Sequence, residues 1–349
     1  MNILVTTVQV PFIRGGAEIH AESLVQALRN HGHSAEIVAL PFEAHPPQRM
    51  LDLMFTFRLL DFSTFSGRNI DLIIPLKFPA YFNSHPNQVA WLLHQHRDVY
   101  DLWEQKFGGL VHNSDAVQFR ETIINGDTKA LGECRQIFSN SQNVANRLKK
   151  FNGLDSIPLY HPPKNADTFT CEEVQGYFFF PSRLNLVKRQ HLVLQAIAKT
   201  RNPVKVVFAG SSDNGLYENE LKQIAEKLQI THRAIFMGQI SEAEKIKYYA
   251  ESMGVIYPPL DEDYGYVTLE GMLSSKPIIT CTDSGGPLEF ITDQETGVIT
   301  KPDSFALARA MDQLWENHRL ASHLGKNARK HYQELDITWT NVVNKLTNI

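Results

Sequence analysis

Short apolar runs alternate along the chain with longer segments whose apolar residues recur every three or four positions. The runs have the length of strands, and the longer segments have the period of a helix that buries one face. This alternation predicts parallel sheets whose strands are joined by crossover helices. The predicted strands of the first half are Ile3–Val8, Glu36–Leu40, Asp71–Leu76, Val89–Leu93 and Gln136–Ser139.

The same pattern begins again after a polar segment near the middle of the chain. Leu159–Asp167 contains Pro162-Pro163 and is polar afterwards, so it is the predicted linker. Two runs of strand and helix predict an α/β protein with two facing, Rossmann-like, doubly wound domains and an interdomain cleft. The predicted strands of the second half are Tyr177–Phe180, Lys205–Ala209, Ala234–Met237, Gly254–Tyr257 and Pro277–Thr280.

Composition narrows the class of protein. A length of 349 residues suits two domains, and a net charge of −4 argues against a general nucleic-acid binder. The three cysteines are scattered without a CxxC motif, which is typical of a reducing compartment. No secretion signal or run of about 18 apolar residues is present, so we expect a cytoplasmic protein. The apolar segment Met50–Phe62 fits a buried helix or, alternatively, a surface that touches the inner face of a membrane or a lipid-linked partner.

Ligands of parallel sheets bind beyond the carboxyl ends of the strands, so the loops there are the candidates for chemistry. Gly15 and Gly16 follow the first strand and open a helix, a position that favours an anion or merely makes a tight turn. The loop lacks the GxGxxG fingerprint of a dinucleotide site. Arg183 and Lys188 lie five residues apart after a strand of the second half. Two such cations would neutralise a diphosphate, although solvated surface charges are the alternative.

Two acids lie eight residues apart in the loop and helix that follow Gly254–Tyr257. Glu262 and Glu270 could accept hydrogen bonds from the hydroxyls of two sugar rings, or they could only complement the helix dipole. The DxD triplet Asp261–Asp263 could hold a metal, but nothing nearby supplies further ligands. We therefore expect no metal site there.

Two further loops have weaker signals. Gly285 and Gly286 follow the strand Pro277–Thr280, and their amides could meet phosphate or sugar. His94 and His96 end the strand Val89–Leu93; without a third ligand in sequence, a polar histidine is favoured over a metal ligand.

Together these loops resemble the retaining glycosyltransferases of the GT-B fold, specifically family four of that classification, and more loosely its bacterial polysaccharide-building members. The resemblance covers almost the whole chain and is strongest over residues 177–297. It is carried by Arg183 with Lys188, Gly210 at a strand end, Phe236-Met237-Gly238, and the spacing Glu262-x7-Glu270 after Pro258.

The resemblance implies a role for each matching residue. Arg183 and Lys188 hold the donor diphosphate, Glu262 binds the donor sugar hydroxyls, and Glu270 binds the ribose. Family members commonly have a glycine two residues after the lysine, where this chain has Gln190. The remaining implied contacts are His94 (or His96) to the donor sugar, Tyr264, Gly265 and Tyr266 to phosphate or sugar, Gly238 and Gln239 along the base, and Gly15 and Gly16 near the phosphates.

The resemblance also implies the division of the chain and its reaction. Residues 1–165 would form the acceptor-side domain, with a C-terminal helix in 332–349 packing back on it, and 170–331 the nucleotide-sugar domain. A hexose would pass from a nucleotide-diphosphate sugar to a saccharide or polyprenyl-linked saccharide, with retained configuration and without metal or other cofactor. The alternatives are an enzyme of the same fold that isomerises or hydrolyses a nucleotide sugar, and a non-catalytic sugar-binding relative.

Overall fold

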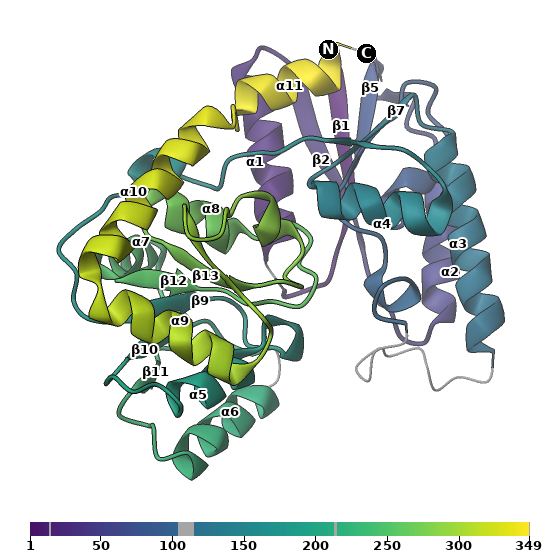
Figure 1. Ribbon diagram of the computed structural model, residues 1–349. Helices are drawn as coiled ribbons and strands as arrows, with labels where there is room; N and C mark the ends of the chain where they lie inside the picture. The colour runs from purple at the N-terminus through teal and green to yellow at the C-terminus, as the bar shows by residue number, and fades with distance from the viewer. Residues whose placement is uncertain (14, 104–114, 213–214, 349) are drawn as a thin grey trace. The chain divides into compact units, whose positions relative to one another are not determined.

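The computed structural model describes residues 1–13, 15–103, 115–212 and 215–348. It divides into two compact units. Figure 1 shows the chain coloured by residue number. Unit 1 comprises Met1–Lys164 and the chain from Thr338 onward, and unit 2 comprises Asn165–Ile337. The C-terminal return to unit 1 therefore begins at Thr338 rather than at residue 332, because the helix that contains residue 332 continues to Glu334 and packs in unit 2.

The sheet of unit 1 is parallel. Its first part has the order β2-β1-β5, and its second part has the order β6-β7-β8. Parallel bridges from Ile73 to Gln88 and from Lys77 to His94 align β5 with β6. The chain order reverses between β1 and β5, so this is the topological switch point where loops diverge. The strands are β1 (Asn2–Gln9), β2 (Ser34–Pro41), β5 (Leu72–Pro75), β6 (Val89–Leu92), β7 (Gln136–Ser139) and β8 (Ile157–Pro158).

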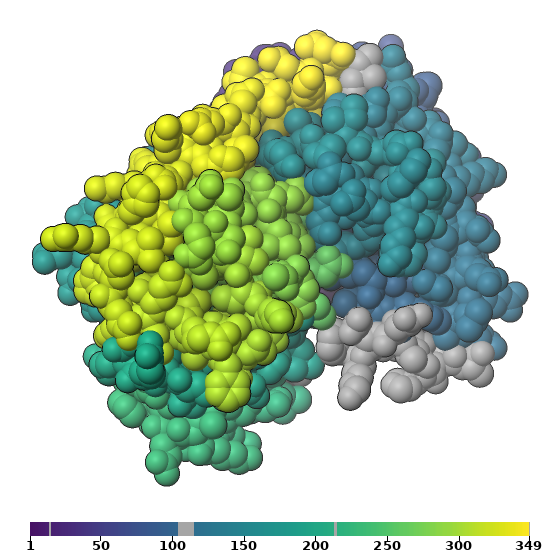
Figure 2. Space-filling view, in the orientation of Figure 1, coloured from purple at the N-terminus to yellow at the C-terminus, as the bar shows by residue number. Residues whose placement is uncertain are grey.

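Successive side chains of a strand point to opposite faces of the sheet, and here both sets are apolar. Helices therefore cover both faces. Ile3 and Val5 of β1 pack with α1 and α11, whereas Leu4 and Val8 pack with α2, α3 and α4. Figures 1 and 2 show the C-terminal segment beside the N-terminal one. The helices are α1 (Gly16–Asn30), α2 (Gln48–Leu59), α3 (Ala116–Gly132), α4 (Gln142–Asn152) and α11 (Trp339–Thr347).

The sheet of unit 2 is parallel, with the strand order β11-β10-β9-β12-β13-β14. Its switch point lies between β9 and β12, the strands that precede the loops of Lys188 and Glu262. The strands are β9 (Phe178–Pro181), β10 (Val206–Ala209), β11 (Ala234–Phe236), β12 (Gly254–Ile256), β13 (Ile278–Cys281) and β14 (Gly297–Thr300). The helices are α5 (Gln190–Ile197), α6 (Leu216–Lys227), α7 (Glu242–Glu251), α8 (Tyr266–Leu273), α9 (Ser304–Glu316) and α10 (His318–Glu334).

The predicted α/β class with parallel sheets is confirmed, and the differences are local. Four strands were not predicted from the sequence: β8, β14, and the two of the small hairpin, β3 (Thr64–Phe65) with β4 (Arg68–Asn69). The expectation of a buried helix at Met50–Phe62 holds for one face only. Met50 and Phe57 of α2 are fully buried, but Phe55 and Leu59 are 68% and 83% exposed. In the part of the chain that the structure describes, no helix has the length and apolarity to span a bilayer.

Candidate active site

The turn that follows β9 fixes the direction of the Lys188 side chain. Asn185 begins the short 3-10 turn Leu186–Lys188, and its Oδ1 accepts a hydrogen bond from the Lys188 amide at 3.1 Å. A side-chain oxygen that satisfies a free amide is the ordinary way to begin such a turn. The turn therefore holds Lys188 at the carboxyl end of β9, beside the switch point.

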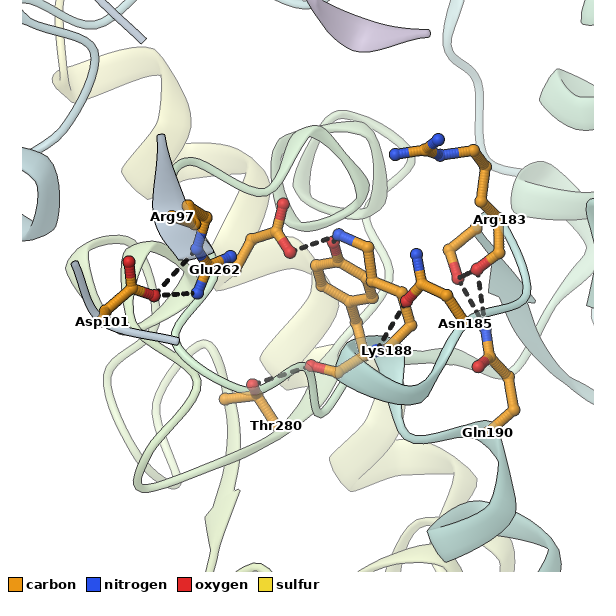
Figure 3. Close-up of polar contacts among 10 residues, drawn as sticks. Arg97, Asp101, Arg183, Asn185, Lys188, Gln190, Glu262 and Thr280 are labelled. Carbon is orange, nitrogen blue, oxygen red and sulfur yellow. Dashed lines mark hydrogen bonds and ion pairs between the residues drawn. The ribbon is translucent and has the colours of Figure 1, made fainter. Parts of the chain in front are cut away.

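The Lys188 ammonium lies between an acid and a phenol (Figure 3). Its Nζ donates to Glu262 Oε2 and, at 3.0 Å, to the hydroxyl of Tyr257. The side chains of Lys188 and Glu262 are 14% and 17% exposed, so a ligand can still reach the pair. Burial, and then the charge of Glu262, raise the pKa of Tyr257 well above its usual value, which keeps the phenol neutral. The arrangement thus offers one cation and one carboxylate to a ligand.

Main-chain hydrogen bonds bring Glu262 to Lys188. The amide of Leu260 donates to Val187 O at 2.7 Å, and the amide of Glu262 donates to Ser284 O at 2.9 Å. Gly286 closes the set by donating to Glu262 O at 2.8 Å. A Cβ at Gly286 would lie 2.7 Å from the nearest main-chain oxygen, so only glycine allows this close approach. The loops after β9, β12 and β13 are therefore joined through their backbones.

An ion pair outside the predicted set links the same loops. The guanidinium of Arg189 donates to both carboxylate oxygens of Asp283, at 2.8 and 2.7 Å. Arg189 has a φ of 60°, a left-handed conformation that turns the chain from the 3-10 turn into α5. The sequence held a weak signal for this pair, since one residue adjoins Lys188 and the other lies in the glycine-rich loop.

Arg183 lies on the same loop as Lys188 and is exposed. Its backbone carbonyl accepts a hydrogen bond from Gln190 Nε2 at 2.9 Å, and its side chain extends away from this contact (Figure 3). The structure thus brings Arg183, Lys188 and Glu262 to one edge of the sheet of unit 2. Their predicted roles toward a donor stay predictions.

Glu270 lies on α8 and is only 7% exposed. Its Oε1 accepts from Lys245 Nζ and its Oε2 from the hydroxyl of Tyr249, each at 2.8 Å. Both oxygens therefore already have protein donors, and a ribose would have to share them. Gly265 begins α8 with a φ of 87°, which a glycine adopts without strain.

The other predicted contacts of unit 2 fall on the same edge of the sheet. Tyr264 is buried and lies edge-on to Tyr266, with their ring centroids 5.4 Å apart. Gly238 has a φ of 66°, and its carbonyl accepts from the amide of Gly210 at 2.7 Å. Gln239 is exposed beyond it. These positions follow the ends of β11 and β12.

Unit 1 has its own charged pair at its switch point. The amide of Gly15, which precedes Gly16 at the start of α1, donates to Glu18 Oε2 at 2.8 Å. Lys77, just after β5, lies 3.5 Å from the other oxygen of Glu18, and burial lowers its pKa. The carboxylate thus occupies the helix start where an anion was expected. Arg14 of this loop lies outside the described residues.

The two histidines after β6 differ in their surroundings. His94 Nδ1 donates to Gln95 O at 2.7 Å; because a carbonyl only accepts, this nitrogen carries a proton. His96 packs between the rings of Phe42 and Phe78, each 5.8 Å away, and burial lowers its pKa to about 4. His96 is therefore neutral at pH 7.

The acidic and histidine side chains do not form a metal site in the described ranges of the chain. No group of three or more His, Cys, Asp or Glu side chains is placed there to hold a metal ion. Asp261 of the DxD triplet instead joins the loops, because its amide donates to Asp283 O at 2.9 Å.

Comparison with known proteins identifies the domain that carries this edge. Residues 167–331 match the family model described as "Glycosyl transferases group 1". The chain is 26% identical over 186 residues to O-antigen chain mannosyltransferase C of Escherichia coli, covering 52% of the chain and 48% of that protein. It is 33% identical over 137 residues to the alpha-1,3/1,6-mannosyltransferase of Dictyostelium discoideum, covering 38% and 32%. The matches thus span about half or less of the length of these two relatives.

Solved structures agree with this result at the level of the fold. Sucrose-phosphate synthase of Thermosynechococcus elongatus matches with a TM-score of 0.78 at 16% identity, over 100% of this chain and 98% of that one. The Anabaena protein HepE, in complex with UDP and glucose, matches with a TM-score of 0.71 at 18% identity and the same coverage. The fold is that of the GT-B glycosyltransferases. Residues 167–331 are therefore similar to a glycosyltransferase group 1 domain, and the two relatives named above are glycosyltransferases.

Proposed function

We propose that this protein is a retaining glycosyltransferase that moves a hexose from a nucleotide-diphosphate sugar to a saccharide or lipid-linked saccharide in glycan biosynthesis. One observation carries the proposal: the Lys188 ammonium, paired with Glu262, lies at the switch point of a glycosyltransferase group 1 domain. The mannosyltransferase names of the relatives make mannose the first sugar to test. The HepE complex contains UDP, so uridine nucleotides are tested beside guanosine nucleotides.

The chemistry follows from the charge that the reaction creates. When the bond between the sugar and the diphosphate breaks, negative charge grows on the phosphate oxygens. Lys188 and Arg183 stabilise this charge, and they do so more strongly in the transition state than in the ground state. Glu262 then exchanges its bond to Lys188 for bonds to the sugar hydroxyls. Because the loops are joined through their backbones, little reorganisation is needed.

Retention of configuration needs no protein nucleophile in this scheme. The leaving diphosphate accepts the proton of the acceptor hydroxyl, on the same face of the sugar from which it departs. Neither a metal nor another cofactor takes part. Activity should therefore survive EDTA; loss of activity in EDTA and its return with a divalent ion would favour a metal at Asp261 and Asp263.

The test is a transfer assay with the purified chain. GDP-mannose and UDP-glucose, labelled in the sugar, are incubated with and without membrane-extracted lipid-linked saccharides, and the products are separated by chromatography. We expect label in a saccharide product, with the anomeric configuration of the donor by NMR. Release of free sugar or an isomerised nucleotide sugar without any acceptor would support the hydrolase or isomerase alternative. Failure of both donors and of their nucleotides to bind would contradict the proposal.

A further inference from the structure

Gln190 is a fully buried polar side chain at the first position of α5. Its Nε2 donates to Ser182 Oγ and to Arg183 O, both at 2.9 Å. Both protons of the amide are thus used to hold the backbone and one hydroxyl of the loop that carries Arg183 (Figure 3). Burying an amide is costly unless it is hydrogen-bonded, and these two bonds satisfy the NH2 group, whereas Gln190 Oε1 has no hydrogen-bond partner among the described residues.

The same loop is also held by the end of β10 and the residues that follow it. Ser182 N donates to Ala209 O at 2.9 Å, and Leu184 N donates to Ser211 O at 3.0 Å. A Cβ at Gly210 would lie only 2.0 Å from Ser182 O, so the two backbones lie in direct contact. The main chain around Arg183 is therefore held both by Gln190 and by the end of β10, although the side chain of Arg183 is exposed.

We propose that Gln190 is a positioning residue for Arg183: it fixes the peptide from which the Arg183 guanidinium reaches the donor diphosphate. This inference rests on the proposed function, because it assumes that Arg183 meets a nucleoside diphosphate. An exposed arginine on a loose loop would lose conformational freedom on binding, whereas a loop fixed in advance spends less free energy on ordering. Gln190 acts through the carbonyl of Arg183 and need not touch the ligand itself.

The test is a double-mutant cycle on nucleotide affinity. Dissociation constants for UDP and GDP are measured by calorimetry in the wild type, Gln190→Met, Arg183→Ala and the double variant. Methionine keeps the volume of Gln190 but removes both donors. We expect Gln190→Met to weaken binding about tenfold and Arg183→Ala about 30-fold, close to the effect of a charge-assisted contact. In the Arg183→Ala background, Gln190→Met should change the dissociation constant less than twofold, because its effect passes through Arg183.

A matched control separates positioning from general damage. Val193 is fully buried on the same helix, so Val193→Ala should lower stability while leaving the dissociation constant within twofold of the wild type. Gln190→Glu gives a second variant with the same shape. Its carboxylate faces Arg183 O without a proton to donate, and it should weaken binding at least as much as Gln190→Met.

The outcomes distinguish this inference from the proposed function. If neither nucleotide binds the wild type, or if Arg183→Ala binds as the wild type does, the assigned donor contact is wrong. If Arg183→Ala is weakened but Gln190→Met is not, or if the two effects multiply in the double variant, the positioning role alone is wrong. Equal weakening by Val193→Ala and Gln190→Met would also overturn it.

Discussion

Ionisable side chains are kept in opposite states at two places, the edge of unit 2 and the core of unit 1. At the edge of unit 2, Lys188 with Glu262 and Arg189 with Asp283 are charged pairs that solvent still reaches. In the core of unit 1, burial favours the uncharged form of four ionisable groups: His20 beside His161, and Asp127 beside Tyr100.

Burial shifts the pKa of each of these four groups toward the uncharged form. His20 Nδ1 lies 2.9 Å from His161 Nε2, and burial lowers the pKa of His20 to about 3. Asp127 accepts a bond from the Tyr100 hydroxyl at 2.6 Å, and burial raises its pKa to about 7. The two shifts have opposite effects on the pH dependence of stability.

The difference distinguishes ionisable groups that can bind a ligand from ionisable groups that are part of the core. A largely buried charged pair costs desolvation free energy, so it adds little net stability, but it holds a charge in a fixed place where a ligand can reach it. A buried neutral group fits the core only while it stays uncharged, so its cost appears as a loss of stability at one end of the pH range. Four perturbations test this contrast.

Lys188→Ala should have the largest effect. Removing the cation that faces the leaving diphosphate should lower the rate of sugar transfer about 10³-fold, which is about 4 kcal/mol of transition-state stabilisation. The free energy of unfolding should fall by about 1–3 kcal/mol, because the largely buried carboxylate of Glu262 loses this cation. Lys222→Ala, which removes an exposed pair with Glu218 on α6, is the control for both measurements. If Lys188→Ala transfers sugar at a rate within tenfold of the wild type, the proposed role of Lys188 is wrong.

Asp127→Asn should show how much a buried carboxyl group lowers the free energy of unfolding at high pH. Unfolded Asp127 loses its proton near pH 4, but the folded protein keeps it to about pH 7. Between these values the folded state binds more protons, so this group makes stability fall as the pH rises. The stability of Asp127→Asn relative to the wild type should rise by about 3 kcal/mol from pH 5 to pH 8 in urea unfolding. The exposed Asp155→Asn is the control, and an equal response in both variants would refute the assignment.

His20→Phe should show the opposite slope. Unfolded His20 binds a proton near pH 6.5, whereas the folded protein excludes it to about pH 3. The unfolded state therefore binds more protons between these values, and the wild type loses stability as the pH falls. Relative to the wild type, His20→Phe should gain about 2 kcal/mol from pH 7 to pH 5. His318→Gln, at an exposed position on α10, should give no such gain. A flat difference for His20→Phe would mean that His20 is charged in the fold.

Arg189→Met should have the smallest effect. Without its pair to Asp283, the loop after β13 remains joined to Glu262 by backbone hydrogen bonds. We expect the dissociation constants for UDP and GDP to rise about fivefold, which is about 1 kcal/mol. Arg201→Met, at a largely exposed position, should leave them unchanged. A 100-fold loss would show that Arg189 contacts the ligand directly.

The sequence predicted the class of fold and the edge at which the candidate site lies. Strand runs and strand-end loops are local features, so Lys188 and Glu262 could be assigned to loops at the carboxyl ends of strands without a structure. Their direct contact needed the strand order β9-β12, which the spacing alone does not give.

What the sequence could not show is where polar side chains of helices point. His20 and Asp127 lie within α1 and α3 and have no motif, and their burial depends on packing against distant segments. Likewise, the amide of Gly15 donates a hydrogen bond to the Glu18 carboxylate, and the presence of two glycines does not predict this contact. Gln190 stood out by its identity, but its two loop contacts follow from tertiary geometry.

The central claim is that the edge of unit 2 recognises a diphosphate through Lys188. Its most direct test compares the affinities of nucleoside diphosphates and monophosphates, UDP against UMP and GDP against GMP, in the wild type and Lys188→Ala. For at least one base, the wild type should bind the diphosphate about 30-fold more tightly, and Lys188→Ala should bind both forms almost equally. Equal affinities in the wild type, or a preference for diphosphate that survives Lys188→Ala, would contradict the account.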